Sequence, residues 1–136
     1  MKCPCHSQKK YLNCCKPFHL GEKLPSTPLE LMKSRYSAYA LKLPKYIIYT
    51  TSPDNPSFTK DTQLWEQDIL IFCNTTTFVN LIIESTSMSN TRGTVSFQAH
   101  LFQNGQNVSF REVSLFEKID GKWLYKSGEI TPLNLV

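Results

Sequence analysis

The sequence predicts an α+β protein, in which a cysteine-rich N-terminal segment precedes several helices and then an antiparallel sheet. Four of the five cysteines lie within the first fifteen residues, helical spacing follows, and the second half alternates with period two around two hairpin turns. The chain has 136 residues, of which 40% are hydrophobic and 19% charged. That length and composition allow one buried core and argue against global disorder.

The first element is the spacing Cys3-Pro-Cys5, eight residues, then Cys14-Cys15. No hydrophobic segment follows Lys2, so we expect no signal peptide and a cytoplasmic protein whose thiols stay reduced. In that setting clustered cysteines predict metal binding, and four soft thiolates suit a tetrahedral zinc ion. Four protein ligands leave no open position for water, so we expect one structural Zn²⁺ and no catalytic residue there.

Two histidines leave the ligand set open. His6 or His19 could replace one sulfur, above all at the crowded Cys14-Cys15 end. The cysteines could instead form a redox pair or remain free thiols.

The next elements are helices. Thr27 can cap a helix that starts at Pro28, with Glu30 completing a capping box, and the apolar spacing continues to about Leu41. Pro44 opens a second, short helix, which ends at a turn over 52–55. Residues 59–73 fit one face of a helix, which we favour, but 69–73 also fit a strand. Their Cys73, far from the other cysteines, is interpreted as an apolar core residue.

The remaining elements are about four antiparallel strands. Asn104-Gly105 and Asp120-Gly121 are both signals for type I′ hairpin turns. The first turn pairs Phe97 with Glu112, and the second places Glu129 opposite Glu112. Since Phe97 belongs to the apolar face, the sheet should direct Glu112 toward the core.

Arg35 lies on the apolar face of the first long helix, one turn from Leu31 and Tyr39. We therefore expect a buried ion pair between Arg35 and Glu112, joining the helix to the sheet.

A resemblance covers the cysteine segment. Cys3-Pro-Cys5-x-Ser7-x3-Tyr11-x2-Cys14-Cys15 resembles the SEC-C motif, the zinc-binding tail of the bacterial preprotein translocase ATPase. The motif usually has glycine where this chain has His6 and Gln8. Glycine tolerates positive φ, so the turn between the cysteines is where this chain differs from the motif.

A second resemblance spans nearly the whole chain. The knuckle and the stretches that follow together resemble the YchJ family, a SEC-C knuckle joined to a nuclear transport factor 2-like (NTF2-like, cystatin-like) domain. These stretches are 31–39, 93–99, 112–116 and 121–125. The resemblance implies a zinc knuckle over 1–20 and, over 21–136, helices packed on a curved antiparallel sheet. It also implies a conical pocket, and Arg35, Tyr36, Glu112, Tyr125 and Glu129 are candidates to line its mouth.

Three functions compete at this stage. The leading hypothesis is a zinc-binding, non-catalytic adaptor whose knuckle contacts an unidentified protein, and the resemblance to the translocase tail implies a ribosomal or translocation-related partner. The second is a small-ligand binder or an enzyme that uses the conical pocket. The third is nucleic-acid binding, because the first 26 residues carry five lysines, Lys2, Lys9, Lys10, Lys16 and Lys23, against Glu22 alone. No apolar run is long enough to span a bilayer, and an exposed sheet face would indicate a homodimer.

Overall fold

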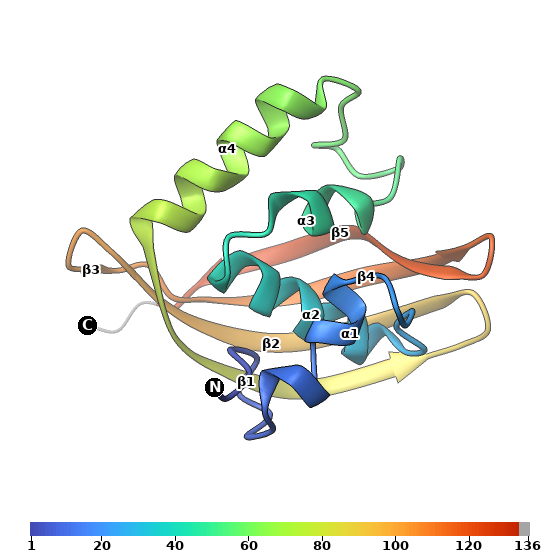
Figure 1. The fold of residues 1–136 in the computed structure, drawn as a ribbon, viewed down its shortest axis with the longest axis horizontal. Helices are drawn as coiled ribbons and strands as arrows, with labels where there is room; N and C mark the ends of the chain where they lie inside the picture. Colours follow the sequence, from blue (N-terminus) through green and yellow to red (C-terminus); the bar gives the residue numbers. More distant parts are fainter. Residues whose placement is uncertain (134–136) are drawn as a thin grey trace.

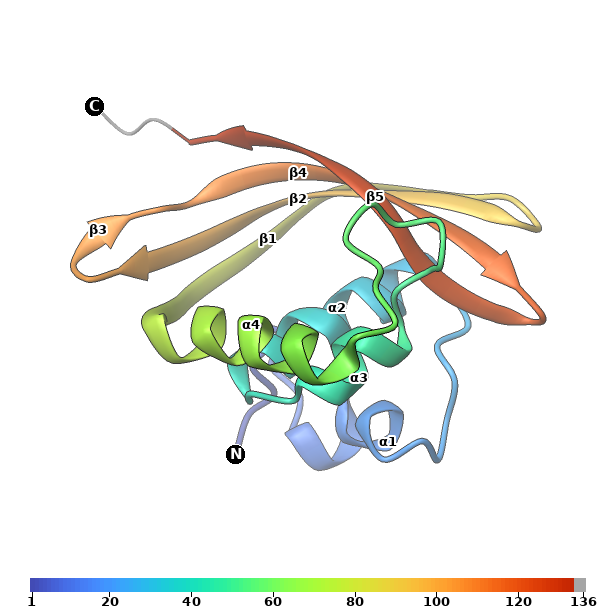
Figure 2. The same cartoon turned by 90° about the horizontal axis from the view of Figure 1, so that it is seen from above.

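The structure is a computed structural model that describes residues 1–133. It shows helices packed on a curved antiparallel sheet, as predicted. Figure 2 shows the helices gathered on one side of the sheet. The N-terminal knuckle lies beyond them, against the layer formed by α2 and α3 (Figures 1 and 2).

The knuckle contains two short helical segments. A 3₁₀ turn spans Tyr11–Asn13, and α1 spans Lys16–His19. Between them lie Cys14 and Cys15, and Cys15 occupies the N-cap position of α1 without a side-chain capping hydrogen bond. An isolated bridge between Lys2 and Lys10 closes the loop that carries Cys3 and Cys5.

The predicted helices are confirmed. Helix α2 spans Pro28–Ala40, and the Thr27 hydroxyl accepts a hydrogen bond from the Glu30 N–H at 3.1 Å. Glu30 reaches back one residue further than a capping box requires, because its carboxylate accepts from the backbone N–H of Ser26. Helix α3 spans Pro44–Tyr49. Residues 59–73 fold mainly as helix: α4 spans Thr62–Thr75 and is capped by Asp61, so the strand alternative is wrong.

The sheet has five strands, in the order β1-β2-β4-β5, with a short β3 paired to β2. Their bounds are β1 Thr76–Met88, β2 Arg92–Gln103, β3 Gln106–Asn107, β4 Phe110–Ile119 and β5 Lys122–Pro132. Asn104-Gly105 and Asp120-Gly121 both have two successive positive φ angles, which confirms the hairpin turns that the sequence predicted. The pairing of Phe97 with Glu112 is also confirmed.

Helix α2 is the centre of the packing. One side of it meets the sheet in a core that includes Leu31, Met32, Val95 and Trp123. Its other side meets α1, α3 and α4 in a second core around Ala38. Gly93 permits the first contact, because a Cβ at that position would overlap Pro28 at the start of α2.

Every helix in the described part of the chain falls short of the length and apolarity that crossing a lipid bilayer requires.

Candidate functional site: a cysteine cluster and an open cavity

The four N-terminal cysteines converge. The sulfurs of Cys3, Cys5, Cys14 and Cys15 all lie within 4.8 Å of one another, although the residues are up to twelve positions apart. Cys3, Cys5 and Cys15 are buried, and Cys14 is half-buried. This group could hold a metal ion.

The backbone turn between the cysteines keeps the shape that glycines usually give it. His6 and Gln8 have φ angles of 64° and 70°, in the left-handed region that glycine adopts without cost. The Cys3 N–H donates to the Lys9 carbonyl at 2.8 Å and closes the loop. The departure from glycine therefore leaves the turn intact at a local conformational cost.

The sulfurs influence one another strongly. A hydrogen bond from Cys15 lowers the pKa of the Cys5 thiol to about 4, whereas burial raises the pKa of Cys3 to about 11. The hydrogen bond to Cys5 raises the pKa of Cys15 in turn. One thiolate is thus stabilised by neighbours that remain thiols, and a cluster of four thiolates requires a cation between them.

The arrangement fits zinc. Sulfurs about 2.3 Å from a tetrahedral Zn²⁺ are about 3.8 Å apart, and Cys5 and Cys14 are separated by 3.6 Å. The Ser7 hydroxyl lies 3.2 Å from the Cys14 sulfur, where it can donate a hydrogen bond to a thiolate and orient it toward the metal.

His19 joins the knuckle to the domain instead of entering the cluster. Its Nε2–H donates to the Ser34 carbonyl on α2 at 2.8 Å, so its Nδ1 accepts from the Tyr11 hydroxyl at 2.7 Å. Burial lowers the pKa of His19 and favours this neutral form. His6 instead meets the ring of Tyr36 edge-on, with 6.1 Å between ring centroids. Among residues 1–133, the side chains that could hold a metal ion together are those of the four cysteines, and neither histidine belongs to that set.

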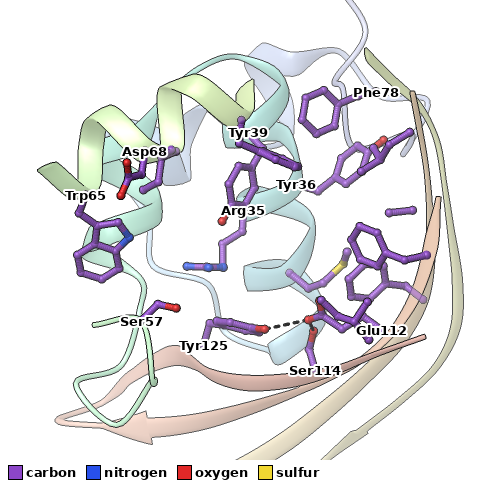
Figure 3. Close-up of a pocket in the computed structure, with 18 of the residues that line it drawn as sticks. Arg35, Tyr36, Tyr39, Ser57, Trp65, Asp68, Phe78, Glu112, Ser114 and Tyr125 are labelled. Carbon is purple, nitrogen blue, oxygen red and sulfur yellow. Dashed lines mark hydrogen bonds between the residues drawn. The ribbon is translucent and has the colours of Figure 1, made fainter. Parts of the chain in front are cut away.

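A cavity of about 580 Å³ lies between the sheet, α2 and α4. Its size falls in the range of small-molecule sites. Most of its wall is apolar and aromatic, and Figure 3 shows Arg35, Tyr125, Glu112 and Ser114 as the polar group inside it. The predicted pocket residues Arg35, Tyr36, Glu112 and Tyr125 all line this cavity.

The predicted ion pair between Arg35 and Glu112 is wrong. Arg35 Nη1 donates to the Ile47 carbonyl at 3.0 Å and to the hydroxyls of Thr50 and Thr51 at 2.7 and 3.1 Å. Its guanidinium lies over the ring of Tyr125, 4.6 Å from the centroid. Those acceptors lie in and directly after α3, and they hold the guanidinium away from Glu112.

Glu112 has its own partners. One of its oxygens, Oε2, accepts from the Ser114 hydroxyl and, at 3.0 Å, from the Tyr125 hydroxyl (Figure 3). Burial and the charge of Glu112 raise the pKa of Tyr125, so the phenol stays a neutral donor. Gly128 leaves room for this group, since a Cβ there would overlap both Glu112 and Tyr125.

The predicted position of Glu129 is also wrong. A bulge in β5 between the partners of Leu115 and Phe116 shifts the register by one, so Glu129 pairs with Val113 and Ile130 pairs with Glu112. Glu129 is exposed and Ile130 lines the cavity in its place.

Sequence reasoning also missed several cavity residues. Thr50 and Thr51 fix Arg35, and Ser57, Trp65 and Asp68 line the wall or the mouth. The pair of β-branched residues directly after α3 was the signal available for the threonines, but only the fold brings them to Arg35.

Fold and site together define a class of protein: an NTF2-like α+β domain that carries a four-cysteine knuckle on its helical layer. Residues 27–128 match the family model described as YchJ, middle NTF2-like domain. The chain belongs to the YchJ family.

Relatives and solved structures agree. A UPF0225 protein of Haemophilus influenzae is 37% identical over 125 residues, which cover 90% of this chain and 74% of the relative. One from Deinococcus radiodurans is 34% identical, with 90% and 85% covered. The solution structure of a SEC-C motif containing protein from Rhodopseudomonas palustris is 34% identical, with a TM-score of 0.81 over 95% of this chain and 98% of that one. A sec-c motif containing protein from Psychrobacter arcticus, 23% identical with a TM-score of 0.76 over 98% and 84% of the two chains, shares the fold.

The predicted division at residues 20 and 21 stays a prediction. The knuckle and the domain are in contact, because Phe18 of α1 packs in the same core as Ala38 and Ile47.

Proposed function

We propose that this protein is a zinc-stabilised, non-catalytic binding protein. Its knuckle holds one structural Zn²⁺ through Cys3, Cys5, Cys14 and Cys15, and its cavity binds a small amphipathic organic anion. The zinc ion supplies folding free energy and bridges the thiolates.

The convergence of four sulfurs supports the zinc site. Metal analysis of protein prepared under reducing conditions tests it: we expect one zinc per chain, lost in Cys14→Ser and kept in Cys73→Ala. Cys73 is the matched control, since it is a buried cysteine within the helical core. Wild-type protein without stoichiometric zinc would contradict the proposal, and so would zinc that survives in Cys14→Ser.

One observation carries the ligand proposal: Arg35 is a buried cation at the cavity wall whose hydrogen-bond acceptors are all neutral. The only ion pair among residues 1–133 joins Arg111 to Glu84 on the outer face of the sheet. Buried charges are normally paired, because desolvation of an uncompensated ion is costly. Glu112, the other buried charge of this cavity, is held by Ser114 and Tyr125 and does not pair with Arg35, so a ligand carboxylate would supply the counter-ion that Arg35 lacks.

The apolar part of the cavity wall indicates what the remainder of the ligand should be. Aromatic and aliphatic side chains from α2, α4 and the sheet surround the polar group, including Trp65, Phe72, Phe97 and Phe110. They favour an apolar body, such as a phenyl or short alkyl chain. The carboxylate at the mouth, Asp68, is exposed and therefore screened by water.

The cavity favours binding over chemistry. The described residues that line it include no histidine, cysteine or lysine. Glu112 is engaged by two hydroxyls, and the phenol that contacts it stays protonated.

Calorimetry with three matched probes tests the ligand class: 3-phenylpropanoate, 3-phenylpropanol and 3-phenylpropylamine. We expect the acid to bind about tenfold more tightly than the alcohol, or ~1.4 kcal/mol, and the amine to bind most weakly. Arg35→Gln should reduce the affinity for the acid to that for the alcohol, whereas the control Arg111→Gln on the outer face of the sheet should leave the affinity for the acid unchanged. Equal binding of the acid and the alcohol by wild type, or an unchanged preference in Arg35→Gln, would overturn the proposal.

A further inference from the structure

A second concave site lies on another part of the molecule, where the knuckle meets the domain. This groove of about 340 Å³ is bounded by the C-terminal part of the knuckle, the 21–25 linker, α3 and the start of β5. It shares no lining residue with the cavity described above. Among the residues that line it, Phe18 and His19 belong to the knuckle and Trp123 belongs to the sheet.

The groove has an apolar floor. Phe18, Tyr46 and Trp123 are less than a tenth exposed and form its base. Above them, Leu24 and Tyr49 are 48% and 56% exposed and leave apolar surface open to solvent. An apolar side chain of a partner could be buried there at little cost in polar desolvation.

Three lysines stand around this floor, on separate segments of the chain. Lys23, Lys45 and Lys122 all line the groove, and all three keep their ammonium groups within reach of solvent. The Lys23 ammonium lies 5.6 Å from the centre of the Phe18 ring, and that of Lys122 lies 5.2 Å from the centre of the Tyr49 ring. Lys122 also donates to the Tyr49 hydroxyl at 3.0 Å.

The described lining contains no carboxylate to neutralise these lysines. The three lysines outnumber the carboxylates beside them, Glu22 in the linker and Asp120 near Lys122, and the excess positive charge lies over a concave surface that concentrates the field. A complementary occupant carries two or more negative charges beside an apolar group.

A peptide suits the groove better than a nucleic acid. The aromatic rings that could stack on bases are buried, with Tyr49 as the exposed exception. Single-stranded nucleic acids are held by successive stacking platforms and by arginine, and the groove offers neither a series of exposed rings nor an arginine. Its lysines act as point charges, which suit the separate carboxylates of a peptide.

We propose that this groove is a docking site for an acidic peptide segment of a partner protein, with an apolar side chain seated between Leu24 and Tyr49 and carboxylates facing Lys23, Lys45 and Lys122. The site is independent of the ligand cavity. It depends on the knuckle, because α1 supplies part of its floor.

The probe is a short synthetic peptide in which leucine is flanked by aspartate and glutamate, added to ¹⁵N-labelled, zinc-loaded protein. Amide shifts should cluster at 18–25, 45–50 and 122–124. The same peptide with glutamine and asparagine in place of its acids should bind at least about tenfold more weakly, and so should one with serine in place of leucine. An oligouridylate of equal net charge should cause smaller shifts in the same amides.

Charge reversal supplies the matched variants. Lys45→Glu should weaken peptide binding about tenfold, or ~1.4 kcal/mol, whereas the exposed Lys60→Glu control, outside the groove, should leave it unchanged. Shifts scattered over all the lysines would overturn the proposal, as would equal effects of Lys45→Glu and Lys60→Glu. Tighter binding of the oligouridylate than of the peptide would assign the groove to nucleic acid instead.

Discussion

Residues 1–20 and the sheet domain bury very different side chains. In the first twenty residues the buried positions are Cys3, Cys5, Cys15 and Phe18. The domain encloses a continuous apolar core between α2 and the sheet, in which Leu31 and Val95 are completely buried. The knuckle has too little apolar surface to fold by burial, so in the proposed arrangement a metal ion takes the role that the core has in the domain.

Removal of zinc by a chelator should have the largest effect, because it should unfold the knuckle and leave the domain folded. Removal of zinc is expected to cost on the order of 10 kcal/mol, as in isolated zinc-finger peptides. Hydrogen exchange should show that amides of residues 1–20 lose protection while those of β2 and β4 keep it. Protection in 1–20 that persists without metal would show that packing alone holds the knuckle.

Leu31→Ala should weaken the domain and leave the knuckle intact. It removes a fully buried side chain from the main core and should destabilise the domain by about 2–5 kcal/mol in urea unfolding. Zinc content of the folded variant should remain at one per chain. Loss of zinc from the folded variant would mean that the two regions are not held independently.

His19→Gln tests the contact between the regions. It disrupts the hydrogen bonds that join Tyr11 and the Ser34 carbonyl, at about 1–3 kcal/mol. Because His19 is not one of the proposed ligands, the zinc content should not change. Zinc lost from a folded His19→Gln protein would make His19 a ligand after all.

Alkaline pH should weaken the domain through two tyrosines. Burial raises the pKa of Tyr36 and of Tyr125 above the ordinary value near 10. Well below pH 10 both phenols are neutral in the folded and unfolded chains, so their contribution to the free energy of unfolding is fully present. As the pH rises toward the folded pKa values, ionisation favours the unfolded chain.

The loss should be on the order of 1 kcal/mol per group near pH 11. Urea unfolding at about pH 8, 10 and 11 measures it. Tyr36→Phe should reduce the dependence, and Tyr49→Phe at an exposed position should not. Identical pH profiles for the two variants would contradict the assignment to Tyr36.

Gln8→Gly should have the smallest effect, and a favourable one. Gln8 has a left-handed backbone, which glycine adopts without the penalty of a Cβ, partly offset by the greater freedom of glycine in the unfolded chain. We expect a gain of about 1 kcal/mol or less, measured as increased resistance to chelators. Lys10→Gly, at an exposed position with a φ of −65°, should show no such gain.

Local signals predicted most of the fold. The cap at Thr27 and the prolines set the helix starts, and Asn104-Gly105 set the β2–β4 register residue by residue. Prediction failed at Glu129, because nothing in the sequence marks the β5 bulge. It failed again at the Arg35 ion pair, because the competing acceptors lie around the end of α3 and approach Arg35 only when the helices pack.

The candidate sites divide in the same way. The cysteines were identifiable because their spacing is local and their chemistry is narrow. Arg35, Tyr36, Glu112 and Tyr125 line one cavity, but the hydrogen bonds of Arg35 and Glu112 depend on hydroxyls that no periodicity marks, those of Thr50, Thr51 and Ser114. The lysines of the groove lie on three separate segments and become a group only in three dimensions.

The extra residue in β5 has a consequence for the chemical character of the cavity. Side chains on a strand alternate between its faces, so one inserted residue decides which of two neighbours looks inward. If the same residues paired without the bulge, Glu129 would lie opposite Glu112 in place of Ile130 and would bring a second carboxylate beside it. A single backbone irregularity thus keeps a second carboxylate away from Glu112 on this face of the sheet.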